Sequence, residues 1–258
     1  MTGRLLEVDG LGKSFGALRA VTDLRFWVDD GEILGLIGPN GAGKTTAINL
    51  ISGWQRPDVG VVRLAGEVVT GVAPHRLVGR GLVRTFQSVT VFPDRPVWIN
   101  VLRGAFSTFY GGFWPAFLDT SDQRRRREAA LARVEELLDE LRLRDVRNVP
   151  AGQLPYGRQK TLGLAIALAS RPRIVLLDEP AAGLSAAEVD VVASVIRHIN
   201  SNGVSAVVVD HNMRFISHLC SRVVVLHHGT ELCAGTPAQV ASHPLVIEAY
   251  LGTAHASA

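Results

Sequence analysis

The sequence predicts an α/β fold in which helices cover both faces of a parallel sheet. Three short apolar runs carry this prediction, EILGLIGPN (32–40), RIVLLDEP (173–180) and SAVVVDH (205–211), and each ends at polar or glycine-rich residues. None of them alternates between apolar and polar residues, and continuous runs of this length favour strands buried on both faces. Helical patterns separate the runs, and strands that alternate with helices indicate an α/β fold.

Composition is that of a globular protein. The chain has 258 residues, of which 47% are hydrophobic and 20% are charged, so one large domain or a core with an inserted subdomain is expected. The formal net charge of +3 is too small to indicate a nucleic-acid partner, and none is expected. Cys220 and Cys233 lack C-x-x-C spacing, which argues against a disulfide scaffold or a thiolate zinc site and suits a reducing cytosol.

No targeting or membrane-spanning segment is recognisable in the sequence. The N-terminal MTGRLLEVDG has an acidic pair and no apolar core of signal-peptide length. No stretch approaches the length needed to cross a bilayer. The chain is therefore expected to be soluble, with the possibility of a membrane-bound partner left open.

Other patterns predict the elements around the parallel sheet. Residues 8–28 suit antiparallel strands with glycine turns, and VVRLAGEVV (61–69) suits a hairpin that turns at Ala65 and Gly66. The tail from Thr236 predicts two short helices that are separated by His243-Pro244. These elements flank the predicted sheet on both sides in sequence.

Residues 122–143 predict an amphipathic helix inside an insertion in the α/β core. Its apolar stripe consists of Leu131, Val134, Leu137, Leu138 and Leu141, at helical spacing. Four arginines, Arg124 to Arg127, stand at its start beside Glu128 and Glu135. Such a charge run is more typical of a solvated helix start than of a phosphate site, and this is the interpretation we favour.

A glycine-rich segment between the first predicted strand and a predicted helix (44–53) points to a nucleoside triphosphate. It matches G-x-x-x-x-G-K-[ST] in the strand-then-helix context that this motif requires. Glycines let the backbone aim several N–H groups at phosphate oxygens. Lys44 would contact the β- and γ-phosphates, and Thr45 would offer its hydroxyl to Mg²⁺. The nucleotide-binding residues predicted here are Gly38, Pro39, Asn40, Gly41, Ala42, Gly43, Lys44, Thr45 and Thr46.

Two adjacent acids end the second apolar run. Asp178 terminates the predicted strand and is a candidate ligand of Mg²⁺. Two neighbouring carboxylates at a dry strand end are costly unless a cation or a water network uses them, which argues against a simple helix cap. Glu179 is therefore the candidate base that orients the attacking water. Ligands of α/β folds gather at the carboxyl ends of the strands, where all these residues lie.

Together these motifs resemble those of an ATP-binding cassette (ABC) subunit, and the resemblance covers nearly the whole chain. It implies a P-loop NTPase (RecA-like) parallel-sheet core with an N-terminal antiparallel β subdomain and an inserted α-helical subdomain. Lys44 and Asp178 match the two nucleotide motifs of the family, and Glu179 matches its catalytic glutamate. On this basis one domain spans 1–258. Its parts are a nucleotide-binding core (1–92 and 160–235), a helical subdomain (93–159) and a C-terminal helical tail (236–258).

The resemblance also assigns roles to isolated residues. Gln87 in RTFQSV matches the glutamine that senses the γ-phosphate and the Mg²⁺ site, and His211 in VVVDHNM matches the switch histidine. The segment 181–185 matches the loop that crosses the dimer interface. Phe15 matches the aromatic residue that stacks on adenine, with core packing as the alternative role.

The family's signature segment usually reads L-S-G-G-Q and faces the γ-phosphate held by the partner subunit. Its place is taken here by Leu154, Pro155, Tyr156, Gly157, Arg158 and Gln159. Pro155 suits the first position of a helix, but it removes both the serine hydroxyl and a backbone N–H. Gly157 keeps an N–H at the helix N-terminus, and Arg158 is a cation that partly compensates. We expect a working but slower site; an inactive site that pairs with a different ATPase subunit is the alternative.

The resemblance implies ATP and Mg²⁺ as cofactors and two subunits that sandwich two ATP molecules. The second ATP-binding subunit is either an identical or a different chain. The other implied partners are transmembrane permease subunits and, indirectly, an extracytoplasmic substrate-binding protein. The implied location is peripheral, on the cytoplasmic face of the inner (plasma) membrane.

Details resemble the ATPases of branched-chain amino-acid importers. They are RTFQ, the long insertion, Tyr156-Gly157, LDEPAAGL and the tail GTPAQV…HPLVIEAYLG. Asp210, before His211, stands where these importers often carry glutamate. The alternatives are an ATPase of a urea or amide importer, of a lipopolysaccharide-type export system, or a non-transport ABC ATPase.

The insertion contains a dense aromatic stretch. Six of the chain's sixteen aromatic residues lie between Phe106 and Phe117. Packing within the helical subdomain is one interpretation. The other is an exposed patch, centred on Phe113 and Trp114, that contacts a membrane subunit.

Overall fold

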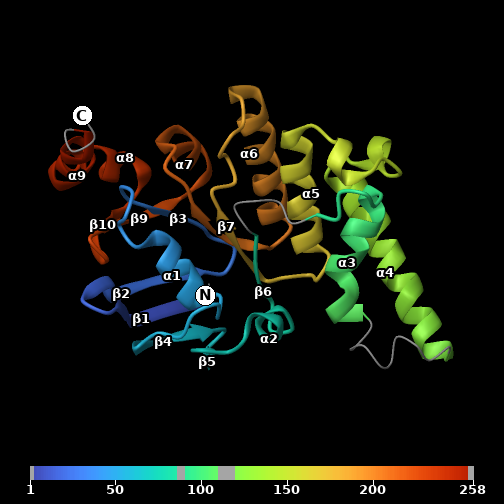
Figure 1. Cartoon of the computed structure of the whole chain (residues 1–258), viewed down its shortest axis with the longest axis horizontal. Coiled ribbons are helices and arrows are strands. Elements are labelled where there is room, and N and C mark those ends of the chain that lie inside the picture. The colour runs from blue at the N-terminus through green and yellow to red at the C-terminus, as the bar shows by residue number, and fades with distance from the viewer. Residues whose placement is uncertain (1–2, 86–90, 110–119, 255–258) are drawn as a thin grey trace.

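The computed structural model describes residues 3–85, 91–109 and 120–254 of the chain (Figure 1). An antiparallel sheet contains β1 (Arg4–Phe15), β2 (Leu18–Asp29), β4 (Val59–Leu64) and β5 (Glu67–Val68), in the order β2-β1-β4-β5. A six-stranded sheet contains β3 (Ile33–Ile37), β6 (Leu82–Arg84), β7 (Ile174–Asp178), β8 (Ser205–Val209), β9 (Arg222–His227) and β10 (Thr230–Gly235). Its order is β10-β9-β3-β8-β7-β6, and only the β9–β10 pair is antiparallel.

Helices cover this second sheet and extend beyond it. They are α1 (Lys44–Ile51), α2 (Pro74–Val78), α3 (Val97–Phe109), α4 (Ser121–Glu140), α5 (Tyr156–Leu168), α6 (Ala186–Ser201), α7 (Met213–Leu219), α8 (Pro237–Ala241) and α9 (Pro244–Ala254). Two short 3₁₀ helices, η2 (Arg144–Val146) and η3 (Ala151–Gln153), precede α5. In Figure 1, α3, α4 and α5 lie at one end of the molecule, and α8 and α9 lie at the other.

The three predicted parallel strands are confirmed as β3, β7 and β8, and every residue of each is buried. Successive side chains of a strand point to opposite faces of the sheet. Leu34 and Leu36 therefore join the apolar cluster formed with α1 and the antiparallel sheet, whereas Ile33 and Ile37 join the cluster formed with α5 and α6. Burial on both faces explains why these runs are continuously apolar.

Three strands of the second sheet, β6, β9 and β10, are not among the predicted elements. RVVVLH forms β9, whose four central residues are buried, and it pairs in parallel with β3. β10 returns from it as an antiparallel edge strand. The run in β9 is as apolar as the predicted ones, so periodicity alone would have identified it.

The antiparallel elements follow their turn chemistry. β1 and β2 pair antiparallel, as predicted for residues 8–28. The hairpin of β4 and β5 turns at Ala65 and Gly66, with φ values of 51° and 82°. Positive φ at both central residues is the geometry of the tight hairpin turns that match strand twist.

Val134, Leu137 and Leu138 of the predicted apolar stripe are buried in α4, and Leu141 is buried as its C-cap residue. Leu131 is only half-buried, and Ala130, which was not predicted, is buried beside it. Arg124 to Arg127 are exposed, as expected for a solvated helix start. The predicted division at 159/160 falls inside α5, and the division of the chain into parts stays a prediction. The two tail helices α8 and α9 are separated by His243, as predicted.

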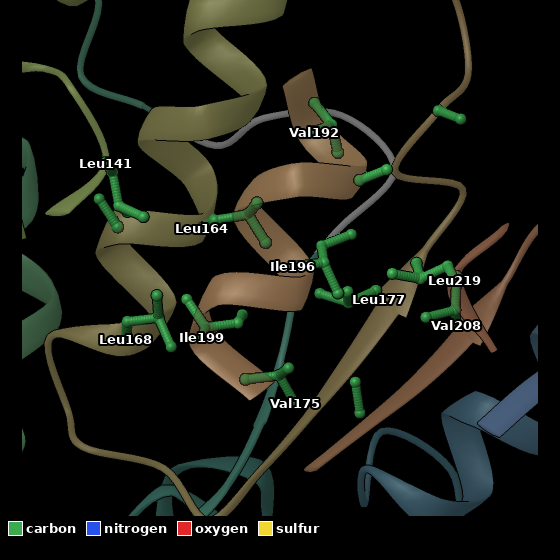
Figure 2. Packing of buried hydrophobic residues seen from close by; sticks show 14 of the residues in the cluster. Leu141, Leu164, Leu168, Val175, Leu177, Val192, Ile196, Ile199, Val208 and Leu219 are labelled. Atoms are coloured by element: carbon green, nitrogen blue, oxygen red, sulfur yellow. The ribbon is translucent and has the colours of Figure 1, made fainter. Parts of the chain in front are cut away.

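The helical layer seals one face of the parallel sheet. Figure 2 shows α6 between α5 and β7, with buried side chains from all three elements in contact range of one another. These side chains include Leu164 and Leu168 of α5, Val192, Ile196 and Ile199 of α6, and Val175 and Leu177 of β7. Within the described ranges, no helix combines the length and apolar character needed to span a bilayer. Phe113 and Trp114 of the aromatic stretch lie outside the described residues.

Truncation of a side chain in this layer tests the packing. Ile196 is fully buried, so Ile196→Ala should lower the free energy of unfolding by about 2–5 kcal/mol through lost transfer free energy and a residual cavity. Val191 lies on the same helix but is 57% exposed, and Val191→Ala should change stability by no more than about 0.5 kcal/mol. Denaturant unfolding of both variants checks this; equal effects would mean that α6 does not pack as described.

Candidate nucleotide-binding site

The predicted residues of the glycine-rich loop and the acids that end or follow β7 and β8 meet at the carboxyl edge of the six-stranded sheet. Gly38 follows the last residue of β3, Asp178 ends β7, and Asp210 follows β8. The parallel register pairs Asp178 with Val209, and Val209 pairs in turn with Leu36. The three strands therefore end side by side, and the residues that follow them come together.

The glycine-rich loop is shaped by close backbone approaches. Gly38 has φ 152°, and a Cβ there would lie 2.2 Å from the carbonyl oxygen of Leu226 in β9. Gly43 has φ 99°, and its Cβ would lie 2.4 Å from the carbonyl oxygen of Ala20 in β2. Neither position accepts a side chain, since the obstacles are backbone atoms. Gly43 is also the N-cap residue of α1, so the loop leads directly into the helix N-terminus.

Lys44 is buried at the base of this loop. Its Nζ donates to the carbonyl oxygens of Gly38 and Pro39, at 2.7 and 3.0 Å. Burial lowers the pKa of Lys44, while Glu179, Asp178 and Asp210 oppose this shift by favouring the charged form. The acids at the ends of β7 and β8 thus lie close enough to Lys44 to act on it electrostatically.

Glu179 is held in an unusual backbone conformation. Its φ is 47°, which is uncommon for a residue other than glycine and is often found at functional sites. Its backbone N–H donates to the Val209 carbonyl oxygen at 2.8 Å, which fixes the turn after β7. The side chain lines the same cleft as the glycine-rich loop.

The donor set at this edge suits Mg²⁺. Asp178 is buried, and Thr45 follows Lys44 at the start of α1. Mg²⁺ prefers oxygen ligands and is commonly held by one or two protein groups together with substrate phosphates. The described residues contain no cluster of three His, Cys, Asp or Glu side chains that could hold a metal ion.

The cleft beside the loop has a volume of about 440 Å³. Phe15 lies on its wall and is exposed, with the Lys13 Nζ 5.8 Å from its ring centroid. An exposed ring on a cleft wall is available for stacking, although that role stays a prediction. His228 also lines the cleft and was not predicted. The lining residues are Phe15, Leu18, Arg19, Ala20, Asn40, Gly41, Ala42, Gly43, Lys44, Thr45, Thr46, Glu179 and His228.

Gln87 and His211 are the two residues that the family resemblance assigns near the γ-phosphate, and the structure describes only His211. Gln87 lies outside the described residues. His211 follows β8, and its side chain is 62% exposed with Nδ1 4.0 Å from Oδ1 of Asp210. The structure therefore brings His211 to the correct edge of the sheet, but not into the wall of the cleft.

Asp210 links two loops of the site. Its Oδ2 accepts a hydrogen bond from the Ala181 N–H at 3.2 Å, and its Oδ1 accepts one from the Asn212 N–H at 2.9 Å. Asp210 is buried, so these bonds satisfy a carboxylate that would be costly to leave unpaired. The loop after Glu179 is thereby tied to the loop that carries His211, a role that the sequence did not reveal.

The predicted signature segment lies at the N-terminus of α5. Pro155 is the N-cap residue and not the first helical residue that the sequence suggested, because its ψ of 148° is extended. The side chain of Pro155 makes no capping hydrogen bond to the helix. Gln159 Nε2 donates to the Leu154 carbonyl oxygen at 2.9 Å and so closes the first turn. None of the described residues 154–159 lines the cleft of the same chain.

An acidic side chain from α6 reaches this helix terminus. The pKa of Glu188 is lowered by hydrogen bonds from the Ser185 hydroxyl, the Ser185 backbone and the Gly157 backbone. A Cβ at Gly157 would lie 2.6 Å from Glu188 Oε1, so glycine makes room for the carboxylate. The S-x-x-E pattern at 185–188 signals a capping box of α6. The contact with Gly157 has no comparable sequence signal.

Arg158 is already paired within the chain. Its Nη1 lies 2.6 Å from Oδ2 of Asp145 in η2, and both side chains are exposed. The predicted compensation for Pro155 by Arg158 therefore requires this ion pair to open. An exposed pair of this kind is weak, at roughly 0.2–1 kcal/mol, so opening it costs little.

Comparison with known proteins identifies the family. The family described as "ABC transporter" matches residues 21–182, and that described as "Branched-chain amino acid ATP-binding cassette transporter" matches residues 232–256. The chain is 37% identical to the high-affinity branched-chain amino acid transport ATP-binding protein BraF of Pseudomonas aeruginosa, over 98% of this chain and 100% of that protein. It is 36% identical to LivG of Escherichia coli, which has the same description, with the same coverage. It is 34% identical to the lipopolysaccharide export system ATP-binding protein LptB of Acidithiobacillus ferridurans, over 96% of this chain and 97% of that protein.

Solved structures confirm the predicted fold. The ADP conformation of MJ1267, an ATP-binding cassette of an ABC transporter, matches with a TM-score of 0.86 and 25% identity, over 97% of this chain and 100% of that one. The "ABC transporter" match covers more than half of the 258 residues, and relatives more than 30% identical are covered over their whole length. The chain therefore belongs to the family of ABC transporter ATP-binding proteins.

Proposed function

We propose that this ATPase subunit energises the uptake of branched-chain amino acids through separate membrane subunits. The observation that carries the proposal is the combination of the nucleotide cleft around Lys44 and Glu179 with the C-terminal match over residues 232–256. That match is to a family described as branched-chain amino acid cassettes. The names of BraF and LivG support the same cargo.

The proposed mechanism begins with ATP bound on the glycine-rich loop. The backbone N–H groups of the loop and the N-terminus of α1 bind its phosphates. Lys44 exchanges its bonds to the Gly38 and Pro39 carbonyl oxygens for bonds to the β- and γ-phosphates. Phe15 stacks on the adenine from the cleft wall. The buried position of Lys44 strengthens its attraction for phosphate, because water screens it less.

Thr45, Asp178 and Gln87 are the proposed ligands of Mg²⁺. Mg²⁺ held by these residues would supply positive charge that offsets the negative charge of the phosphates. Glu179 orients the attacking water from its fixed turn and accepts a proton from it. His211 acts as the switch histidine at the end of β8. The hydrogen bonds of Asp210 couple the loop that carries His211 to the loop after Glu179.

The site is completed by a second ATP-binding subunit. Residues 154–159 lie away from the cleft of their own chain, as expected if they act on nucleotide bound to another chain. The N–H of Gly157 is the donor offered there, because Pro155 supplies neither a hydroxyl nor an N–H. Glu188 lies beside Gly157 in the single chain, so its carboxylate has to move when a γ-phosphate approaches this N–H. Like charges in contact repel, which makes nucleotide and Glu188 mutually exclusive partners of Gly157.

The other proposed partners are permease subunits, with an extracytoplasmic binding protein acting through them. The chain would then be peripheral on the cytoplasmic face of the inner membrane. A lipopolysaccharide-type export role is the second candidate, since LptB is 34% identical over nearly its full length. The C-terminal match and the higher identity to BraF and LivG favour the importer.

Replacing the proposed base separates binding from hydrolysis. Glu179→Gln should retain ATP binding, because the loop and Lys44 are intact, and should lower the hydrolysis rate by about 10²–10⁴-fold. A fluorescent nucleotide titration and a phosphate-release assay on the same sample measure the two steps. Glu128→Gln on the exposed face of α4 is the matched control and should leave both unchanged. Hydrolysis at the wild-type rate in Glu179→Gln would exclude this residue as the base.

Transport by the assembled complex tests the cargo. The chain, co-expressed with its permease and binding-protein partners in a host that lacks branched-chain importers, should support uptake of labelled leucine. Excess isoleucine or valine should compete with leucine because they share its apolar side chain, whereas urea should not. The Glu179→Gln complex should show no uptake. Uptake of urea without leucine would overturn the proposed cargo while leaving the ATPase assignment intact.

A further inference from the structure

We propose that Arg84 is a positioning residue that holds the Asp178 carboxylate in the orientation needed to bind Mg²⁺ together with ATP. The inference rests on the proposed function, because it assigns a supporting residue to the metal site named there. The Arg84 Nη2 donates to the Asp178 Oδ2 at 2.8 Å. Only 9% of the Arg84 side chain and 8% of the Asp178 side chain are exposed.

The other arm of the guanidinium reaches the helix that follows the glycine-rich loop. Arg84 Nη1 donates to Asn49 Oδ1 at 2.6 Å and lies 3.4 Å from Ser52 Oγ. Ser52 is the C-cap residue of α1, and its hydroxyl donates to the Ile48 carbonyl oxygen at 2.6 Å. The guanidinium is planar and rigid, so anchoring one arm on α1 fixes the direction of the other. Arg84 therefore connects α1, which begins with Lys44, to the end of β7 through its hydrogen bonds.

The backbone of Arg84 is fixed to the same strand as its partner. Arg84 pairs with Leu176 in the parallel register of β6 and β7. The next residue, Thr85, donates its N–H to the Leu176 carbonyl oxygen at 2.9 Å. The Arg84 side chain thus extends from its register position to the last residue of β7. Because backbone and guanidinium are both anchored, Oδ2 of Asp178 has a defined position.

This arrangement suits a metal ligand better than it suits stability. Burying a charged pair is costly, and well-packed apolar residues in its place are often equally stabilising. A carboxylate has two oxygens and about four lone-pair sites, so the bond from Arg84 leaves Asp178 able to accept a metal. Carboxylates that bind metals are usually held by such outer hydrogen bonds, whose loss typically costs about 10–100-fold in metal affinity or activity.

The test measures how much Mg²⁺ strengthens ATP binding, without using hydrolysis as the readout. A fluorescent ATP analogue is titrated into the full chain with Mg²⁺ and with EDTA, and Mn²⁺ binding in the presence of ATP is followed by electron paramagnetic resonance. In Arg84→Met the metal-free affinity should stay within about twofold of wild type. The increase in ATP affinity on adding Mg²⁺ should be roughly 10–100-fold smaller than in wild type, with a matching loss of bound Mn²⁺.

The chain offers a matched control at the amino-terminal ends of the strands, on the side of the sheet opposite to the nucleotide cleft. Arg222 forms a two-bond ion pair with Glu32, with Nε–Oε1 and Nη2–Oε2 distances of 2.9 and 3.0 Å, and these side chains are 21% and 10% exposed. Arg222→Met removes a comparable arginine–carboxylate pair at the amino end of β9, away from the cleft. It should lower thermal stability and leave the Mg²⁺-dependent gain unchanged. Arg84→Lys keeps the positive charge but lacks the planar guanidinium with its two donor arms. The increase in its ATP affinity on adding Mg²⁺ should lie between those of wild type and Arg84→Met.

Each outcome decides the proposal. An unchanged Mg²⁺-dependent gain in Arg84→Met, or a larger one, would show that Arg84 is structural or competes with the metal, and would overturn the inference. If Arg84→Met cannot be obtained folded, a wild-type gain in Arg84→Lys overturns it in the same way. A wild-type chain whose ATP affinity does not respond to Mg²⁺ would instead overturn the proposed metal site itself. A selective loss of the gain in the Arg84 variants supports the proposal.

Discussion

Parallel pairing among β3, β8 and β7 is the constraint on which the rest of the site depends. Their register brings the ends of all three strands to one edge of the sheet. The glycine-rich loop, the two acids at the end of β7 and the loop that carries His211 therefore meet there. Burial on both faces keeps this register, because a slip by one residue would exchange the apolar sets that face α1 and α6. The helices that seal the sheet thus also fix the geometry of the nucleotide cleft.

Charge at this edge is arranged so that each buried group has a partner. Lys44 is held by loop carbonyl oxygens, Asp178 by Arg84, and Asp210 by two backbone N–H groups. Buried ions are tolerated when they are paired and hydrogen-bonded. The same bonds orient the groups before nucleotide arrives, which reduces the reorganisation that binding requires.

Local chemistry made much of this predictable. The loop 38–45 has a motif whose glycines are explained by backbone contacts at Gly38 and Gly43, and the apolar runs are explained by burial on both faces. β9 was missed although its run is equally apolar, because no functional motif follows it. The contacts of Arg84 with Asp178 and of Glu188 with Gly157 join residues far apart in sequence. They depend on strand register and helix packing, which one sequence without its fold does not specify.

In the proposed mechanism, the site for nucleotide bound near Lys44 is completed by the 154–159 segment of a second copy of this chain, despite Pro155. The most direct measurement is the solution mass of the Glu179→Gln variant with and without ATP and Mg²⁺, with Lys44→Ala added as the variant that cannot hold nucleotide. The Glu179→Gln chain should be a monomer that becomes a dimer only with ATP, and only when Lys44 is present. A Glu179→Gln chain that binds ATP tightly but stays monomeric would contradict it, since this signature would then be unable to close on an identical chain.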